Sequence, residues 1–148
     1  MRLSIILPTG MYGPVILPAH LEGNPHVWLR RLLAGGSGRH EVIPNDSSSM
    51  SHLHDLANLF IAAYENPAAH GRYFGVYDSW HWQDIYKELE RLIPGMKTPE
   101  PLGTTPLAPT GFDFTRRDSL GVPMRDIPTL LRETVDWLRA GPTFDSRP

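Results

Sequence analysis

The segment Leu3-Ser-Ile-Ile-Leu7, followed directly by Pro8-Thr-Gly-Met-Tyr-Gly-Pro14, decides the fold of this chain. The run is apolar apart from one serine, and Pro8 and Gly10 end it. A short apolar run of this kind is typical of a strand that is buried on both faces of a parallel sheet. Because such a strand needs neighbouring strands and covering helices, the sequence predicts an α/β fold.

Length and composition predict a single globular domain over residues 1–148. Of the 148 residues, 41% are hydrophobic and 20% are charged, and the formal net charge is −2. This balance argues against a disordered chain and against a basic protein that binds nucleic acid. The absence of cysteine excludes disulfides and thiolate chemistry. The first apolar run is too short to span a bilayer, and no signal-peptide cleavage pattern follows it, so we expect a cytoplasmic protein that does not enter a membrane.

Apolar residues at helical spacing predict four helices. Three of them cover residues Pro25–Ala34, Asp55–Tyr64 and Ile127–Arg139. The fourth carries Trp82 to Leu92 and is expected to start at an Asp78 or Ser79 cap. In the second helix the expected buried stripe contains Leu56, Leu59, Phe60 and Ala63.

Short β-branched and aromatic runs predict further strands, at Glu41–Ile43, near Met50–Leu53 and at Arg72–Tyr77. We expect loops at Met11–Glu22 and Ser47–Ser49, because the first is broken by Gly13, Pro14 and Pro18 and the second is polar. The proline-rich segment Thr98–Gly111 fits either an extended crossing or a mobile loop. Residues Phe112–Leu120 are expected to form a short strand and one helical turn.

Four segments in this order resemble the extended short-chain dehydrogenase/reductases, in particular the NAD(P)-dependent epimerase/dehydratase and dihydroflavonol-reductase-like group. The segment from Leu7 to Pro14 is similar to that family's sixth sheet strand with its Pro-x-x-x-Tyr-Gly-Pro motif. Ser51-His-Leu-His-Asp-Leu-Ala57 resembles its x-His-Val-x-Asp-Val-Ala step from strand to helix, and Gly71-Arg-Tyr-Phe resembles its Gly-x-Tyr-x strand. The stretch from Phe112 to Leu138 resembles its Asp-x-Ser-x-x-x-x-Leu-Gly segment and closing Thr-Val-x-Trp-Leu helix.

The resemblance implies a partial Rossmann-type fold, made of the last parallel strands and the small substrate-binding lobe, without the N-terminal dinucleotide-binding half. It implies NAD(P) as the family's cofactor and a small molecule as substrate. The residues that it assigns to the cofactor are Pro8, Thr9, Gly10 and Met11. The residues that it assigns to the substrate are Tyr12, His52 and His54.

The family's two chemical motifs are missing from this chain. None of its tyrosines is followed four residues later by lysine, as the family's Tyr-x-x-x-Lys pair requires. The turn Gly10-Met-Tyr-Gly13 has no third glycine, and Pro14 supplies no amide hydrogen to a phosphate. We therefore assign no catalytic residue, and we expect a truncated protein that is inactive and does not bind NAD(P) by itself.

A missing first half would leave one edge of the Leu3–Leu7 strand without a partner. Because an open apolar edge invites pairing with another chain, we expect a homo-oligomer or a complementing N-terminal half. The alternative is a non-catalytic ligand-binding or oligomerisation module derived from the same family.

His52 and His54 alternate across Leu53, so in a strand their side chains would lie on one face, as a metal-binding pair requires. No third ligand has a suitable spacing, and we therefore assign no metal site.

Overall fold

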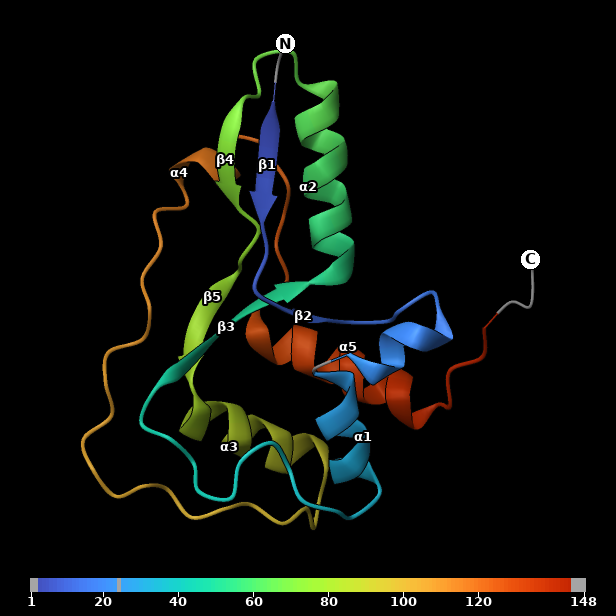
Figure 1. The fold of residues 1–148 in the computed structure, drawn as a ribbon, viewed down its shortest axis with the longest axis vertical. Coiled ribbons are helices and arrows are strands. Elements are labelled where there is room, and N and C mark those ends of the chain that lie inside the picture. The colour runs from blue at the N-terminus through green and yellow to red at the C-terminus, as the bar shows by residue number, and fades with distance from the viewer. Residues whose placement is uncertain (1–2, 24, 145–148) are drawn as a thin grey trace.

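The computed structural model describes residues 3–23 and 25–144, which form two regions that lie end to end (Figure 1). We call the first the two-stranded region; it contains β1 (Ser4–Leu7), β4 (Gly71–Phe74) and helix α2 (Leu53–Glu65). We call the second the larger lobe. Its strands are β2 (Gly10–Tyr12), β3 (Ser47–His52) and β5 (Asp78–His81), and its main helices are α1 (His26–Leu33), α3 (Trp82–Leu92) and α5 (Ile127–Arg139). A 3-10 helix, η1 (Pro18–Glu22), and the short helix α4 (Thr115–Asp118) complete the described elements.

In the two-stranded region β1 runs parallel to β4, with Ser4 opposite Gly71 and Leu7 opposite Phe74. The prediction that β1 is buried on both faces is wrong. Ile6 is 6% exposed because its side chain points toward α2, whereas Leu3 is 59% and Ile5 36% exposed. Successive side chains of a strand point to opposite faces, and α2 covers only one of them.

The larger lobe contains a mixed sheet, in which β3 pairs parallel with β2 and antiparallel with β5. Two predictions fail here. Ser47–Ser49 belongs to β3 and is not a loop, and Asp78 and Ser79 belong to β5 and do not cap α3. The hydroxyl groups of Ser49 and Ser79 lie 2.7 Å apart across the two strands, so these polar residues pair inside the sheet.

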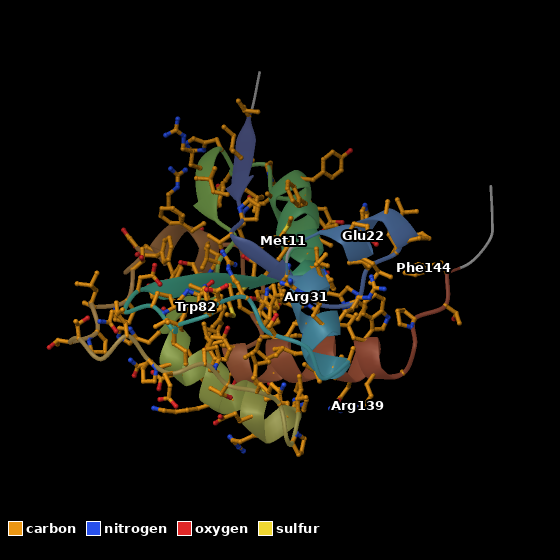
Figure 2. All side chains as sticks on the ribbon, turned by 60° about the horizontal axis from the view of Figure 1, so that its bottom comes forward. Met11, Glu22, Arg31, Trp82, Arg139 and Phe144 are labelled. Atoms are coloured by element: carbon orange, nitrogen blue, oxygen red, sulfur yellow. The ribbon has the colours of Figure 1, made fainter. Side chains whose placement is uncertain are left out.

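Helices α1, α3 and α5 pack on this sheet and enclose the main hydrophobic core. Figure 2 shows side chains filling the space between the sheet and α3 and α5. The core includes Trp28, Leu29 and Leu32 from α1, Trp82, Ile85 and Leu89 from α3, and Ile127, Leu131 and Leu138 from α5. The sequence therefore predicted these three helices and their buried faces correctly. Helix α2 is also confirmed, but Phe60 on its expected buried stripe is 55% exposed.

The connecting segments differ from several expectations. The expected loop Met11–Glu22 contains part of β2 and all of η1, and the expected strand Glu41–Ile43 is reduced to one bridge between Ile43 and Pro101. The proline-rich segment is an extended crossing, because Leu107 donates a backbone hydrogen bond of 2.8 Å to Asn45. Within residues 3–23 and 25–144, no helix is long and apolar enough to cross a membrane.

Candidate functional site

Residues Pro8–Met11 comprise the turn after β1 and the first two residues of β2, and they lie between the two regions (Figure 1). Pro8, Gly10 and Met11 are exposed and Thr9 is half-buried. The Thr9 amide donates to the Ser51 hydroxyl at 3.3 Å, and the Thr9 hydroxyl lies 3.2 Å from the same oxygen. Contacts with β3 thus hold one side of the segment, and its other side is exposed to solvent.

The backbone of β2 does not form a phosphate cradle. Its residues pair with β3 in a parallel ladder from Gly10 to Tyr12, so their amide groups are not gathered into an anion-binding turn. A Cβ atom at Gly10 would lie 3.2 Å from the Ser49 carbonyl oxygen, which requires a small residue there. The close packing of Gly10 against β3 therefore limits the size of the side chain at this position.

A cavity of about 330 Å³ opens directly beside this segment. Met11 forms one wall, and η1, the start of α1 and the start of α2 form the others. The remaining lining residues are Val15, Ala19, His20, Gly23, His26 and Leu53. The cavity thus joins the predicted cofactor contact to a mostly apolar surface with two imidazoles.

His26 is the buried polar residue of this cavity, with 3% of its surface exposed. Its Nε2 lies 2.8 Å from the Gly13 carbonyl oxygen, and burial lowers the pKa of the ring, so His26 is neutral near pH 7. A carbonyl oxygen can only accept, so Nε2 carries the proton of the neutral ring and Nδ1 is the unprotonated nitrogen. Trp137 packs edge-on against the ring at 6.0 Å between centroids.

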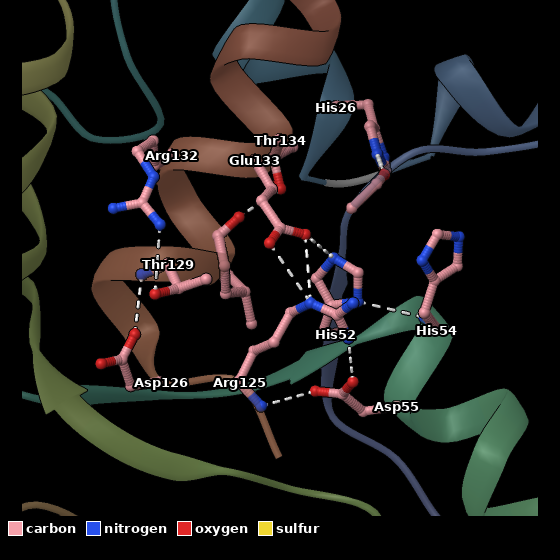
Figure 3. A network of polar contacts seen from close by, with 12 residues as sticks. His26, His52, His54, Asp55, Arg125, Asp126, Thr129, Arg132, Glu133 and Thr134 are labelled. Atoms are coloured by element: carbon pink, nitrogen blue, oxygen red, sulfur yellow. Dashed lines mark hydrogen bonds and ion pairs between the residues drawn. The ribbon is translucent and has the colours of Figure 1, made fainter. Parts of the chain in front are cut away.

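Behind the cavity, four side chains form a polar network that joins the two regions (Figure 3). Asp55 in α2 is 1% exposed and accepts a 2.7 Å hydrogen bond from the Arg125 amide and another from the Arg125 guanidinium. The Arg125 Nε lies 3.1 Å from Glu133 Oε2 in α5. The same Glu133 oxygen lies 3.2 Å from His52 Nε2, which is an ion-pair distance without hydrogen-bond geometry.

His52 is fully buried and its protonation state follows from its neighbours. Its Nδ1 accepts a 3.1 Å hydrogen bond from the His54 amide and caps α2, so the proton of the neutral ring is on Nε2. Burial, assisted by the Arg125 charge, lowers the pKa of His52. A Cβ atom at Gly13 would lie 2.7 Å from His52 Nε2, and Gly13 has a φ of +112°, so only glycine fits there.

The structure brings the three predicted substrate residues near one another but gives them different surroundings. Tyr12 is 1% exposed in the main core and His52 is 0% exposed, whereas His54 lies on the exposed surface of α2. The prediction that His52 and His54 share one face of a strand is wrong, because the strand ends at His52 and the helix begins at Leu53. Their rings nevertheless lie 5.2 Å apart between centroids. Burial favours a supporting role for Tyr12 and His52, and substrate contact stays a prediction.

Within the described residues there is no group of three or more His, Asp or Glu side chains that could hold a metal ion. Sequence reasoning missed His26, Arg125 and Glu133. Arg125 contacts Asp55 across 70 positions of sequence, and no periodic pattern connects the two. His26 could have been noticed as a polar residue at the start of a predicted helix.

Comparisons with known proteins find relatives of this chain by sequence and by fold. No family model matches the chain. Over 136 residues it is 30% identical to cinnamoyl-CoA reductase CAD2 from Medicago truncatula, an alignment that covers 90% of this chain and 40% of that protein. UDP-glucuronic acid 4-epimerase from Bacillus cereus, solved with NAD, superimposes with a TM-score of 0.72 at 17% identity and covers 93% of this chain and 45% of its own. UDP-glucose 4-epimerase from Thermotoga maritima gives 0.69 at 16% identity, with 93% and 46% covered.

These findings define the fold as part of the Rossmann-like α/β fold of NAD-dependent epimerases and reductases. They confirm the resemblance to the extended short-chain dehydrogenase/reductases that the four sequence segments predicted. The chain spans less than half the length of the relatives it matches.

Proposed function

We propose that this chain is the substrate-binding C-terminal portion of an NAD(P)-dependent oxidoreductase or epimerase-like protein of the cytoplasm. The observation that carries the proposal is the exposed Pro8–Met11 segment with the cavity that opens beside Met11. In the complete protein, Pro8–Met11 would lie against NAD(P), and the cavity would hold a small carbonyl or hydroxyl compound. The curated reductase and the NAD-bound epimerases support this proposal, because this chain shares their fold.

In the same proposal, Tyr12, His52 and His54 serve the substrate in two ways. His54 is exposed and can reach a ligand directly. Tyr12 and His52 are buried, and they hold β2 and the start of α2 in place behind the cavity. The His52 ring also packs against the backbone at Gly13, where no side chain fits, and this backbone carries the carbonyl that His26 contacts.

By itself the chain would be inactive and would not bind NAD(P). The described β2 residues pair with β3 in a parallel ladder and do not form a glycine-rich phosphate-binding turn, and the sequence has no Tyr-x-x-x-Lys pair. Titration of the isolated protein with NADH or NADPH, followed by tryptophan fluorescence, should give no saturable change. Binding with a micromolar Kd would contradict this part of the proposal.

The function itself is tested by restoring the missing portion. Residues 3–144 replace the matching portion of the Medicago truncatula reductase, and NADPH oxidation is followed with cinnamoyl-CoA and with small aldehydes. We expect cofactor binding together with turnover of at least one substrate, and loss of both when Gly10→Val crowds the Ser49 carbonyl. A folded chimera that binds NADPH but reduces none of these substrates, and epimerises no UDP-sugar, would contradict the proposal.

The open edge of β1 supports the proposed partner. The Leu3 and Leu7 carbonyls accept hydrogen bonds from Gly71 and Gly75 in or next to β4, at 2.8 and 2.9 Å. Because successive residues of a strand direct their backbone groups to opposite edges, Ser4 and Ile6 direct theirs away from β4. We propose that a complementing N-terminal half pairs there, or, in its absence, a second copy of the chain.

The same edge supports the alternative function, a non-catalytic ligand-binding or oligomerisation module. The coding sequence upstream of Met1 separates the two. A glycine-rich turn and a Tyr-x-x-x-Lys pair encoded there would support the enzyme portion, and an unrelated reading frame would support the module.

A further inference from the structure

We propose that Thr105 is a phosphorylation site for a proline-directed protein kinase. The sequence contains two threonines that are followed directly by proline, in the steps Thr98-Pro99 and Thr105-Pro106, and no serine that is followed by proline. Both steps lie in the same proline-rich segment, but the structure gives them opposite surroundings. The inference is independent of the proposed function, because neither step lies in the Pro8–Met11 segment or lines the cavity beside it.

A threonine before proline has the backbone conformation that suits a kinase groove. The proline ring disfavours the helical region for the residue before it and holds that residue extended. Proline also has no amide hydrogen, so the pocket that takes the residue after the phosphoacceptor need not supply an acceptor for one. Thr98 and Thr105 both meet this local condition. The sequence by itself therefore does not choose between them.

Thr98 does not meet the second condition, which is access to its hydroxyl group. Its Oγ1 is buried and has no hydrogen-bond partner among the described residues. Two residues earlier, Met96 packs against the main hydrophobic core. Thr98 and Pro99 also line two hollows, one beside the turn at residues 35–38 and one beside α3. A kinase therefore reaches the Thr98 hydroxyl only if this part of the chain detaches from the lobe.

Thr105 lies in the part of the segment that is open to solvent. Every residue from 100 to 111 is exposed, and Figure 1 shows the segment as a long crossing on the outside of the larger lobe. The amides of Leu102 and Leu107 donate hydrogen bonds of 3.0 and 2.8 Å to carbonyl groups of the chain that precedes β3. Thr105 lies between these two anchors, and neither buried cluster contains a residue from 103 to 106.

The reaction transfers the γ-phosphoryl group of ATP to the Thr105 oxygen. The new bond joins Oγ1 to phosphorus, the bond between the γ-phosphorus and the bridging oxygen breaks, ADP leaves, and the hydroxyl proton passes to the catalytic aspartate of the kinase. The product carries a charge of about −1.5 to −2 near pH 7. Because Glu100 is the single charged residue between positions 98 and 111, phosphorylation would make a nearly neutral surface segment strongly acidic.

The test treats the complete 148-residue chain with a mitogen-activated protein kinase and ATP and locates the phosphate by tandem mass spectrometry. A synthetic peptide of residues 95–111 is treated in parallel, because it contains both Thr-Pro steps without the fold that separates them. We expect the peptide to be modified at both threonines. In the folded chain, kcat/KM at Thr98 should be at least about tenfold below kcat/KM at Thr105.

Three variants of the chain identify the residues that the kinase reads. Thr105→Val removes the hydroxyl and should abolish incorporation of phosphate at the segment. Pro106→Ala restores an amide hydrogen and should lower kcat/KM at least about tenfold. Thr104→Val is the matched control, because Thr104 is an exposed neighbouring threonine that no proline follows, and it should leave incorporation unchanged.

All three substitutions lie in the exposed segment, so the variants should fold, and circular dichroism checks that they do. Equal rates at Thr98 and Thr105 in the folded chain would overturn the inference. So would incorporation that Thr105→Val leaves unchanged, or a folded chain that the kinase does not modify at Thr105.

Discussion

The larger lobe and the two-stranded region each contain a pair of parallel strands, but only in the larger lobe does a third described strand extend the pair. In the lobe, β5 extends the β2–β3 pair and three helices cover the sheet, with sixteen described residues in one buried cluster. In the two-stranded region, β1 has β4 as its single described partner and α2 covers one face, with six described residues in the buried cluster. The difference shows that the larger lobe encloses its core, whereas the two-stranded region leaves one sheet face and one strand edge uncovered by described residues.

Polar contacts join these two regions where their cores do not merge. Asp55 belongs to α2 of the two-stranded region, while Arg125 and Glu133 belong to the segment and helix that close the larger lobe. Burial of Asp55 is tolerated because Arg125 supplies both an amide and a guanidinium donor. The network therefore connects α2 of the two-stranded region to α5 of the larger lobe.

The largest expected effect separates the two cores. Leu131→Ala in α5 and Leu59→Ala in α2 both truncate a side chain that is 0% exposed. Leu131→Ala should lower the free energy of unfolding by about 3–5 kcal/mol, because it opens a cavity in the tightly enclosed core. Leu59→Ala should cost about 2–3 kcal/mol, because its small core can relax toward the open face. Urea denaturation measures both, and equal costs would contradict the comparison.

Hydrogen exchange tests the same difference between the two regions. Amides of β1 and β4 should exchange faster than those of β3, because the two-stranded region opens locally while the larger lobe stays folded. In the Leu59→Ala variant this faster exchange should spread to α2 and leave β3 protected. Uniform protection across both regions would show that they unfold as one unit.

The next effect concerns the network between the regions. Arg125→Met leaves the buried Asp55 carboxylate with one backbone donor and should cost about 2–3 kcal/mol. Arg132→Met is the matched control, since Arg132 is exposed and donates a 3.4 Å hydrogen bond to the Thr129 hydroxyl. In a double-mutant cycle, adding Asp55→Asn should recover part of the loss. If the two arginine variants unfold at the same urea concentration, the network does not stabilise the junction.

Acidification should lower the free energy of unfolding through three histidines that are fully or partly buried. Burial lowers the pKa of His26, His40 and His52 below the usual 6.5, so the unfolded chain binds more protons than the folded one as the pH falls below about 7. The stabilisation is complete above pH 6.5 and decreases as the pH falls from there toward the folded-state pKa values. Each histidine contributes at most about 1.4 kcal/mol per pH unit.

Urea denaturation between pH 7.5 and pH 5 measures this slope. In this range Asp113 and Asp126 stay ionised, because hydrogen bonds lower the pKa of each below 3.8. His52→Asn keeps an acceptor at the cap of α2 and should reduce the slope. A slope that His52→Asn leaves unchanged would show that His52 does not contribute.

The smallest effect on stability is expected at the open edge of β1. Ser4→Pro removes an amide that points away from β4 and should change the free energy of unfolding by no more than about 0.5 kcal/mol. It should nevertheless reduce self-association in sedimentation velocity, because the open edge loses a donor. Ile5→Pro removes an amide that faces β4 and should destabilise the region. A monodisperse monomer at high protein concentration, before any substitution, would contradict pairing of this edge.

The helices could be predicted from the sequence because their signal is local. The spacing of apolar residues placed α1, α2 and α5 within two residues of their observed ends, and it identified Leu131, Thr134, Val135 and Leu138 as one buried face. The strands were harder to predict. Ser47–Ser49 has no apolar pattern, and it is a strand because β5 pairs with it from more than 25 residues away.

The candidate site, too, could be predicted from the sequence only in part. Motifs pointed to Pro8–Met11, His52 and His54, but they did not reveal that His52 is buried or that the helix begins between the two histidines. Nor did they reveal the cavity, because His26, Val15 and Leu53 meet only after β2, α1 and α2 have packed.

The sequence by itself determined the fold class, the family resemblance, the main helices and the motifs that are missing. These depend on residue identity and on spacing within short windows, where apolar periodicity and turn residues act directly. The tertiary structure alone decided which face of β1 is open, how Arg125 neutralises Asp55, and which nitrogen of His26 donates to the Gly13 carbonyl. Those properties arise from contacts between residues far apart in the chain, and burial sets their energies.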